Sequence, residues 1–97
     1  MTNNNLPHYQ LLIDGAWVEG ADNQVMHSSN PANGAEWATF ACANKDDVDR
    51  AVKAARRNLN SGPWANMNAT QRGALLYRLA DLVEKNAQKL GEVETTD

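Results

Sequence analysis

The chain has 97 residues, of which 42% are hydrophobic and 22% charged, and its formal net charge is −3. That length fits one small domain or one part of a larger domain. Because the chain is mildly acidic and its basic residues are scattered, we expect neither a nucleic acid nor a membrane as its partner.

The N-terminal residues MTNNNLPHYQ are polar and lack the basic and apolar regions of a signal peptide. We therefore expect residues 1–10 to form a flexible tail. No apolar run approaches the roughly 18–20 residues of a membrane span. A single cysteine, Cys42, excludes an internal disulfide, and together these features favour a cytoplasmic protein.

Residues 11–18 carry the signature of a β-hairpin. The β-prone runs LLI and AWV flank Asp14-Gly15, a dipeptide that supplies the positive φ angles of a type I′ turn. A short strand-like run, residues 25–27, follows a polar break, and two turns are indicated at Asn30-Pro31 and Asn33-Gly34. The stretch EWATFAC, residues 36–42, alternates loosely and predicts a third strand.

After residue 43 the apolar period changes from two to 3.6, which predicts helices. Asn44 is the expected N-cap of the first helix, and Asp47 completes a capping box with it. Ser61-Gly62-Pro63 ends this helix. Asn68 and Gln71 form a second capping box, from which we expect one helix to run to residue 96, with a break near Asn86 as the alternative.

The second helix carries an apolar stripe at helical spacing. Its members are Leu75, Leu76, Leu79, Leu82, Val83, Ala87, Leu90 and Val93. One short amphipathic helix and a small sheet can cover only part of this stripe. We therefore expect a partner surface, either in the remainder of a longer chain or in another subunit.

No residue combination in the sequence indicates an active site. Cys42 lies in an apolar run without a local activator, so a structural thiol is expected. His8 lies in the expected tail, and His27 is too far from it in sequence to match a metal-binding spacing. Asp46, Asp47 and Asp49 are interpreted as stabilising a helix start. The six glycines form no phosphate-binding loop.

From Leu11 onward, however, the sequence resembles the N-terminus of the aldehyde dehydrogenase superfamily. LLIDGAWVEG resembles the family's opening hairpin, and SSNPANGAE resembles its asparagine-proline turn, usually written NPATGE. KDDVDRAVKAAR is similar to its first helix, and GPWANMNATQRGALLYRLADLVEKN to its tryptophan joint and second helix. LGEVETTD is similar to a segment commonly written LAxLETLD, which continues in the family as GKP.

The resemblance implies an α+β piece of an α/β protein. It would consist of a β-hairpin, a short third strand and two or three helices, over residues 11–97, at the start of a Rossmann-like coenzyme-binding domain. One departure is Ala35-Glu36-Trp37, which stands where the family prefers a small aliphatic run. This difference leaves the exact pairing of the third strand open.

The resemblance also implies a function for a longer relative, an NAD(P)-dependent oxidation of an aldehyde to a carboxylic acid. A cysteine thiolate attacks the aldehyde, hydride passes from the thiohemiacetal to NAD or NADP, and water hydrolyses the thioester. The residues for these steps are expected beyond residue 97. Residues 1–97 alone are expected to bind no coenzyme and to be inactive. The alternative is a truncated interaction module that docks on full-length subunits.

One family site maps onto this sequence. Many members bind a structural Na+ or K+ through the carboxylate of the LETLD-like motif and main-chain oxygens before the asparagine-proline turn. The corresponding residues are Asp97, Ser28 and Ser29. Such oxygen donors suit a hard monovalent cation. The alternative interpretation is that Asp97 is solvated and the serines simply lead into a turn.

Overall fold

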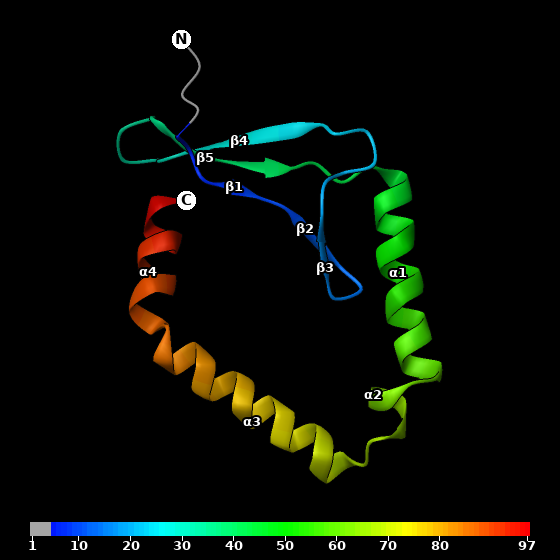
Figure 1. Cartoon of the computed structure of the whole chain (residues 1–97). Coiled ribbons are helices and arrows are strands. Elements are labelled where there is room, and N and C mark those ends of the chain that lie inside the picture. Colours follow the sequence, from blue (N-terminus) through cyan, green and yellow to red (C-terminus); the bar gives the residue numbers. More distant parts are fainter. Residues whose placement is uncertain (1–4) are drawn as a thin grey trace. The chain divides into compact units, whose positions relative to one another are not determined.

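The structure, a computed structural model, describes residues 5–97 (Figure 1). The chain divides into two compact units. The first contains the described residues up to Ala55 together with Thr96 and Asp97, and the second contains Arg56–Thr95. Part of the predicted tail, residues 1–4, lies outside the described residues.

The predicted hairpin is confirmed. Strand β2, Leu11–Ile13, pairs antiparallel with β3, Ala16–Val18. The two turn residues between them both have positive φ angles, 54° at Asp14 and 77° at Gly15. Asp and Gly tolerate this region, which is why the dipeptide specifies a turn whose twist matches the strands.

A second, three-stranded sheet has the order β1-β5-β4 (Figure 1). Strand β1, His8–Tyr9, runs parallel to β5, Glu36–Ala41, and β4, Val25–Ser29, runs antiparallel to β5. The predicted third strand is therefore confirmed and lies at the centre of this sheet. The tail expected over residues 1–10 is wrong at His8 and Tyr9, because both are paired with β5.

A β-bulge interrupts the pairing of β4 with β5. Ser28 is paired with Ala38, but Ser29 is paired with Glu36, so the register passes over Trp37 as an extra residue. The sequence left the pairing uncertain at this position, and the bulge resolves it.

The bulge also changes the face on which Trp37 lies. The centroids of the Trp37 and Tyr9 rings lie 6.2 Å apart, and the Cα partner of Tyr9 on β5 is Phe40. The Trp37 indole also bonds to Ser28, the partner of Ala38. Strict alternation would have sent Trp37 to the opposite face from Ala38 and Phe40. We call the side with Tyr9, Trp37 and Phe40 the aromatic face of the sheet.

Helix α1 spans Lys45–Asn60 and ends before the predicted stop at residues 61–63. Its capping box is present as predicted. The Asp47 N–H donates to the Asn44 Oδ1 at 3.0 Å, and the Asn44 N–H donates to the Asp47 Oδ2 at 2.9 Å. Each partner satisfies a main-chain donor that the first helical turn leaves without an intrahelical acceptor.

The second unit consists of helical segments. A single turn, α2 (Pro63–Asn66), which the sequence analysis did not predict, precedes α3 (Ala69–Lys85). The predicted capping box at Asn68 and Gln71 is confirmed by reciprocal bonds of 2.9 and 3.0 Å. The prediction of one continuous helix to residue 96 is wrong, and the alternative, a break near Asn86, is confirmed. Asn86 leaves helical geometry, and α4 begins again at Ala87 and runs to Thr96.

The described residues bury little apolar surface. The buried hydrophobic residues among them are Ala38, Ala41 and Ala54. Leu75 is half-buried, and the other large side chains of the apolar stripe are exposed, from 60% at Leu76 to 39% at Val93. The partner surface expected for this stripe stays a prediction. Within residues 5–97, no helix is both long and apolar enough to cross a membrane.

Candidate cation site

The structure brings two of the three predicted cation ligands into contact. Ser28 lies on β4, and its hydroxyl group bonds to the carboxylate of Asp97, 69 positions later in the chain. Both residues belong to the first unit. Ser29 is the last residue of β4 and adjoins the bulge. The hydroxyl, the carboxylate and the neighbouring main-chain carbonyls are all hard oxygen donors.

A third side chain, which the sequence analysis did not assign to this place, completes a chain of hydrogen bonds. The Trp37 Nε1 donates to the Ser28 Oγ at 3.0 Å. Because an indole N–H can only donate, the Ser28 oxygen must accept this bond. The hydroxyl proton of Ser28 is then directed at the Asp97 carboxylate, which can only accept when ionised. The direction of both bonds is therefore determined.

This donor set fits a monovalent cation better than a transition metal. Hard cations prefer carboxylate, carbonyl and hydroxyl oxygens, whereas zinc-like ions prefer imidazole or thiolate. Within the described part of the chain, no three His, Cys, Asp or Glu side chains form a group that could hold a metal ion.

A buried carboxylate fixes the loop after β3 to the start of α1. Asp47 is 1% exposed, and besides its bonds with Asn44 it accepts the Ala21 N–H at 3.0 and 3.1 Å and pairs with Arg50. The Asn44 N–H, then the Ala21 N–H, hold the pKa of Asp47 below its ordinary value, against the opposing effect of burial. We call these contacts the Asp47 latch. It is structural, as expected for the helix-start acids.

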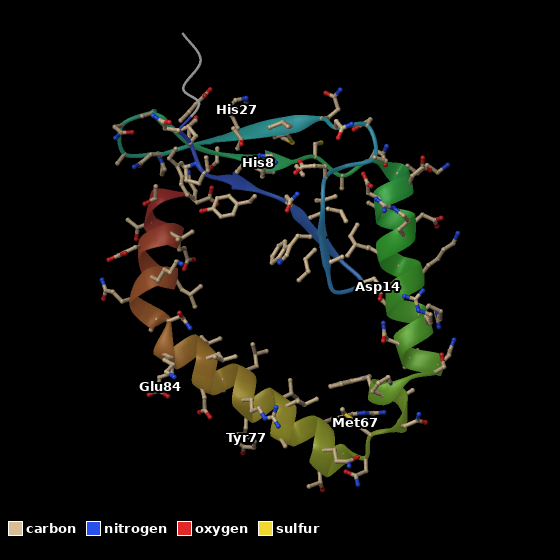
Figure 2. The ribbon with its side chains drawn as sticks, in the orientation of Figure 1. His8, Asp14, His27, Met67, Tyr77 and Glu84 are labelled. Atoms are coloured by element: carbon tan, nitrogen blue, oxygen red, sulfur yellow. The ribbon has the colours of Figure 1, made fainter. Side chains whose placement is uncertain are left out.

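The two histidines lie on the other face of the sheet, opposite the aromatic face. His8 is on β1 and His27 on β4 (Figure 2), and both have Thr39 of β5 as Cα partner. The His8 Nε2 lies 2.9 Å from Glu19, and its Nδ1 lies 2.7 Å from the Thr39 hydroxyl. His27 pairs with Glu36 at 3.1 Å. These are cross-strand and strand–hairpin pairs.

The His8 contacts affect Glu19, which also accepts a bond from Gln10. The bond from His8, followed by that from Gln10, lowers the pKa of Glu19 below its ordinary value. The expectation that His8 lies in a tail is wrong, because this side chain links β1 to the end of the hairpin, but the residue is exposed to solvent as expected. No local signal predicts the contacts of His8, because its partners lie 11 and 31 positions away in the sequence.

The remaining candidates have plain structural surroundings. Cys42 is a half-buried free thiol, as expected, and its main-chain N–H donates to the Gln24 carbonyl at 2.9 Å. Asp49 pairs with Lys53 one helical turn later, at 3.0 Å. Trp64 sits at the helix joint, with the Arg72 guanidinium 5.5 Å above its ring. Each contact stabilises local structure.

Comparison with known proteins identifies one family throughout. The family model described as "Aldehyde dehydrogenase family" matches residues 17–97. The chain is 46% identical, over 92 residues, to (Z)-2-((N-methylformamido)methylene)-5-hydroxybutyrolactone dehydrogenase of Acinetobacter baylyi. It is 42% identical, over 89 residues, to a mitochondrial aldehyde dehydrogenase of Rattus norvegicus. These matches cover 95% and 91% of this chain but only 18% and 17% of the two relatives.

Solved structures give the same result. An aldehyde dehydrogenase from Bacillus cereus, solved as an NAD+ complex, matches with a TM-score of 0.91 and 37% identity, over 93% of this chain and 18% of that one. An NAD-dependent aldehyde dehydrogenase from Sinorhizobium meliloti matches with a TM-score of 0.88 and 33% identity, over 94% and 18%. The predicted α+β segment of an α/β enzyme is thereby confirmed. The chain spans between 10% and 19% of the length of the relatives that it matches.

Proposed function

This chain belongs to the aldehyde dehydrogenase family, and we propose that it serves as the N-terminal segment of an NAD(P)-dependent enzyme that oxidises an aldehyde to a carboxylic acid. The observation that carries this proposal is the family match over residues 17–97, which includes β4, β5, two of the three residues of β3 and every described helix. Membership makes the protein an oxidoreductase by family.

The segment's own part is structural in this proposal. When bound, NAD(P)+ supplies the hydride acceptor, but the described residues do not fit a nucleotide. The three glycines with positive φ, Gly15, Gly34 and Gly62, each stand in a separate turn or helix start rather than in one phosphate-binding loop. The nucleophile, the general base and the coenzyme contacts would therefore come from outside residues 5–97.

The apolar stripe supports this division of labour. Leu79, Leu82 and Val83 are 50–56% exposed in the second unit. Completing the burial of one such side chain contributes up to about 1.5–3 kcal/mol. We propose that the remainder of the dehydrogenase chain, or another subunit, covers these side chains. The alternative of a stand-alone docking module is not favoured by matches that cover most of this chain.

We also propose that Ser28, Ser29 and Asp97 hold a structural Na+ or K+ in the complete protein. The contact between Ser28 and Asp97 supports this proposal, since it places a carboxylate beside β4 close to the two serines. The cation would bind the remaining Asp97 lone pairs together with main-chain oxygens of the two serines.

The dehydrogenase proposal is tested on the protein from its source cells, isolated with an antibody against residues 1–97. We expect a chain several times heavier than 10.6 kDa that reduces NAD+ or NADP+ when an aldehyde is added. A protein of 10.6 kDa that co-purifies with full-length subunits would support the docking module instead. A heavier protein without aldehyde-dependent coenzyme reduction would refute the proposed activity.

A further inference from the structure

The side chain of Trp37 contacts the cation site without offering it an oxygen. We propose that Trp37 is a positioning residue for that site: its indole N–H fixes the Ser28 hydroxyl as a donor to Asp97 and so holds the carboxylate in place. This inference rests on the proposed binding of Na+ or K+ at Ser28, Ser29 and Asp97. Its physical basis is the pair of hydrogen bonds from Trp37 to Ser28 and from Ser28 to Asp97.

Trp37 reaches Ser28 because of the β-bulge. The register of β4 and β5 passes over Trp37, and the ring lies on the aromatic face with Tyr9. Strict alternation would have placed this side chain on the opposite face, with Thr39 and the histidines. Tyr9 contacts the ring at an interplanar angle of 58°, a tilted arrangement that favours one ring orientation. The indole N–H is therefore aimed by packing.

The orientation of Ser28 matters because a hydroxyl group can rotate. Without the indole, the Ser28 proton has several acceptors within reach of rotation, including water. With the indole N–H on its oxygen, the proton is left for Asp97. The bond from Trp37 to Ser28 is partly buried, which reduces competition from water for it.

The hydrogen bonds from Trp37 to Ser28 and from Ser28 to Asp97, which we call the relay, do not exhaust the binding capacity of Asp97. A carboxylate offers about four lone-pair sites, and the Ser28 hydroxyl takes one of them. The others remain for a cation, for which the main-chain oxygens of Ser28 and Ser29 are the further proposed donors. The relay thus prepares a ligand before the cation arrives.

The test measures K+ binding to the full chain by titration, with choline chloride keeping the ionic strength constant. Trp37→Phe retains the aromatic ring and removes the donor. We expect the apparent Kd for K+ to rise about three- to tenfold, the effect of losing one hydrogen bond. Trp17→Phe, at an exposed tryptophan on β3, is the matched control and should stay within about twofold of the parent protein.

A second measurement, the hydrogen exchange of the Trp37 indole N–H, needs no K+ and does not depend on the stability of Trp37→Phe. In protein carrying 15N-labelled tryptophan, the Trp37 indole N–H should exchange slowly with solvent in choline chloride, and faster in Ser28→Ala. Equal exchange in both proteins would overturn the relay. Unchanged K+ affinity in Trp37→Phe would overturn the positioning role while leaving the cation site intact. No response of the parent protein to K+ would overturn both, without touching the proposed dehydrogenase activity.

Discussion

Gly20 offers the sharpest test of how the loop after β3 packs on the start of α1. An added Cβ at this position would lie 2.3 Å from the Cys42 carbonyl oxygen and 3.4 Å from the Asp47 Oδ2. Real Cβ atoms essentially never approach another heavy atom within 3.0 Å. Gly20→Ala therefore forces the loop or the end of β5 to move by at least about 0.7 Å, the difference between the 2.3 Å approach to the Cys42 oxygen and the 3.0 Å limit.

That movement falls on the Asp47 latch. The neighbouring Ala21 N–H donates to Asp47 at 3.0 and 3.1 Å, ordinary lengths that a shift of about 0.7 Å would carry beyond hydrogen-bonding range. Overpacking of this kind costs about 1–3 kcal/mol. We expect Gly20→Ala to lower the free energy of unfolding by that amount and to speed hydrogen exchange at the Ala21 amide.

The assay is urea unfolding of the protein that carries this chain, read from the midpoint at constant m-value. Gly73→Ala is the matched control, because nothing lies within 4 Å of its added Cβ. Gly73 is inside α3, where alanine should stabilise by about 0.5–1 kcal/mol. If Gly20→Ala stays within about 0.5 kcal/mol of the parent protein, the close approach described here is wrong.

Three further predictions follow from other contacts. The native pKa of Asp47 lies below its ordinary 3.8, so the native state binds this proton less readily than the unfolded state does. The stability that Asp47 contributes should be full above pH 3.8 and should fall as the pH drops through the native pKa. Asp47→Asn should therefore flatten the acid limb, the fall of the urea midpoint at low pH. An unchanged acid limb would show that the latch is not ionised. Asn68→Ala should destabilise the start of α3 by about 1 kcal/mol, measured by amide exchange at Gln71, and equal exchange in both proteins would contradict the capping box. Leu82→Glu should sharply lower the yield of soluble, active enzyme, whereas Tyr77→Glu, outside the stripe and 78% exposed, should not; equal yields would refute the covered stripe.

Local signals in the sequence predicted the local structure well. Asp14-Gly15 specified the hairpin turn, and the pairs Asn44 with Asp47 and Asn68 with Gln71 located two helix starts. Each signal acts through hydrogen bonds between residues at most three positions apart. Such bonds form whatever the rest of the chain does, so the residue types suffice to predict them.

The long-range contacts could not be predicted in this way. His8 pairs with Thr39 on β5, and nothing in MTNNNLPHYQ distinguishes a two-residue strand from a tail. Trp37 fits an alternating strand by its residue type, and only the pairing with Ser28 and Ser29 shows that it is the extra residue of a bulge. The ligands Ser28, Ser29 and Asp97 were assigned by family resemblance, not by their spacing.

The bond between Ser28 and Asp97 also bears on the order of folding. The Asp47 latch spans 26 positions to Ala21, whereas Asp97 is 69 positions from Ser28. Closing the longer loop costs roughly 0.9 kcal/mol more entropy, and at ribosomal speeds of about 5–20 residues per second, Asp97 is synthesised about 2.5–10 s after Asp47. Hairpins close in microseconds. We therefore expect the sheet and the latch to form before the contact with Asp97.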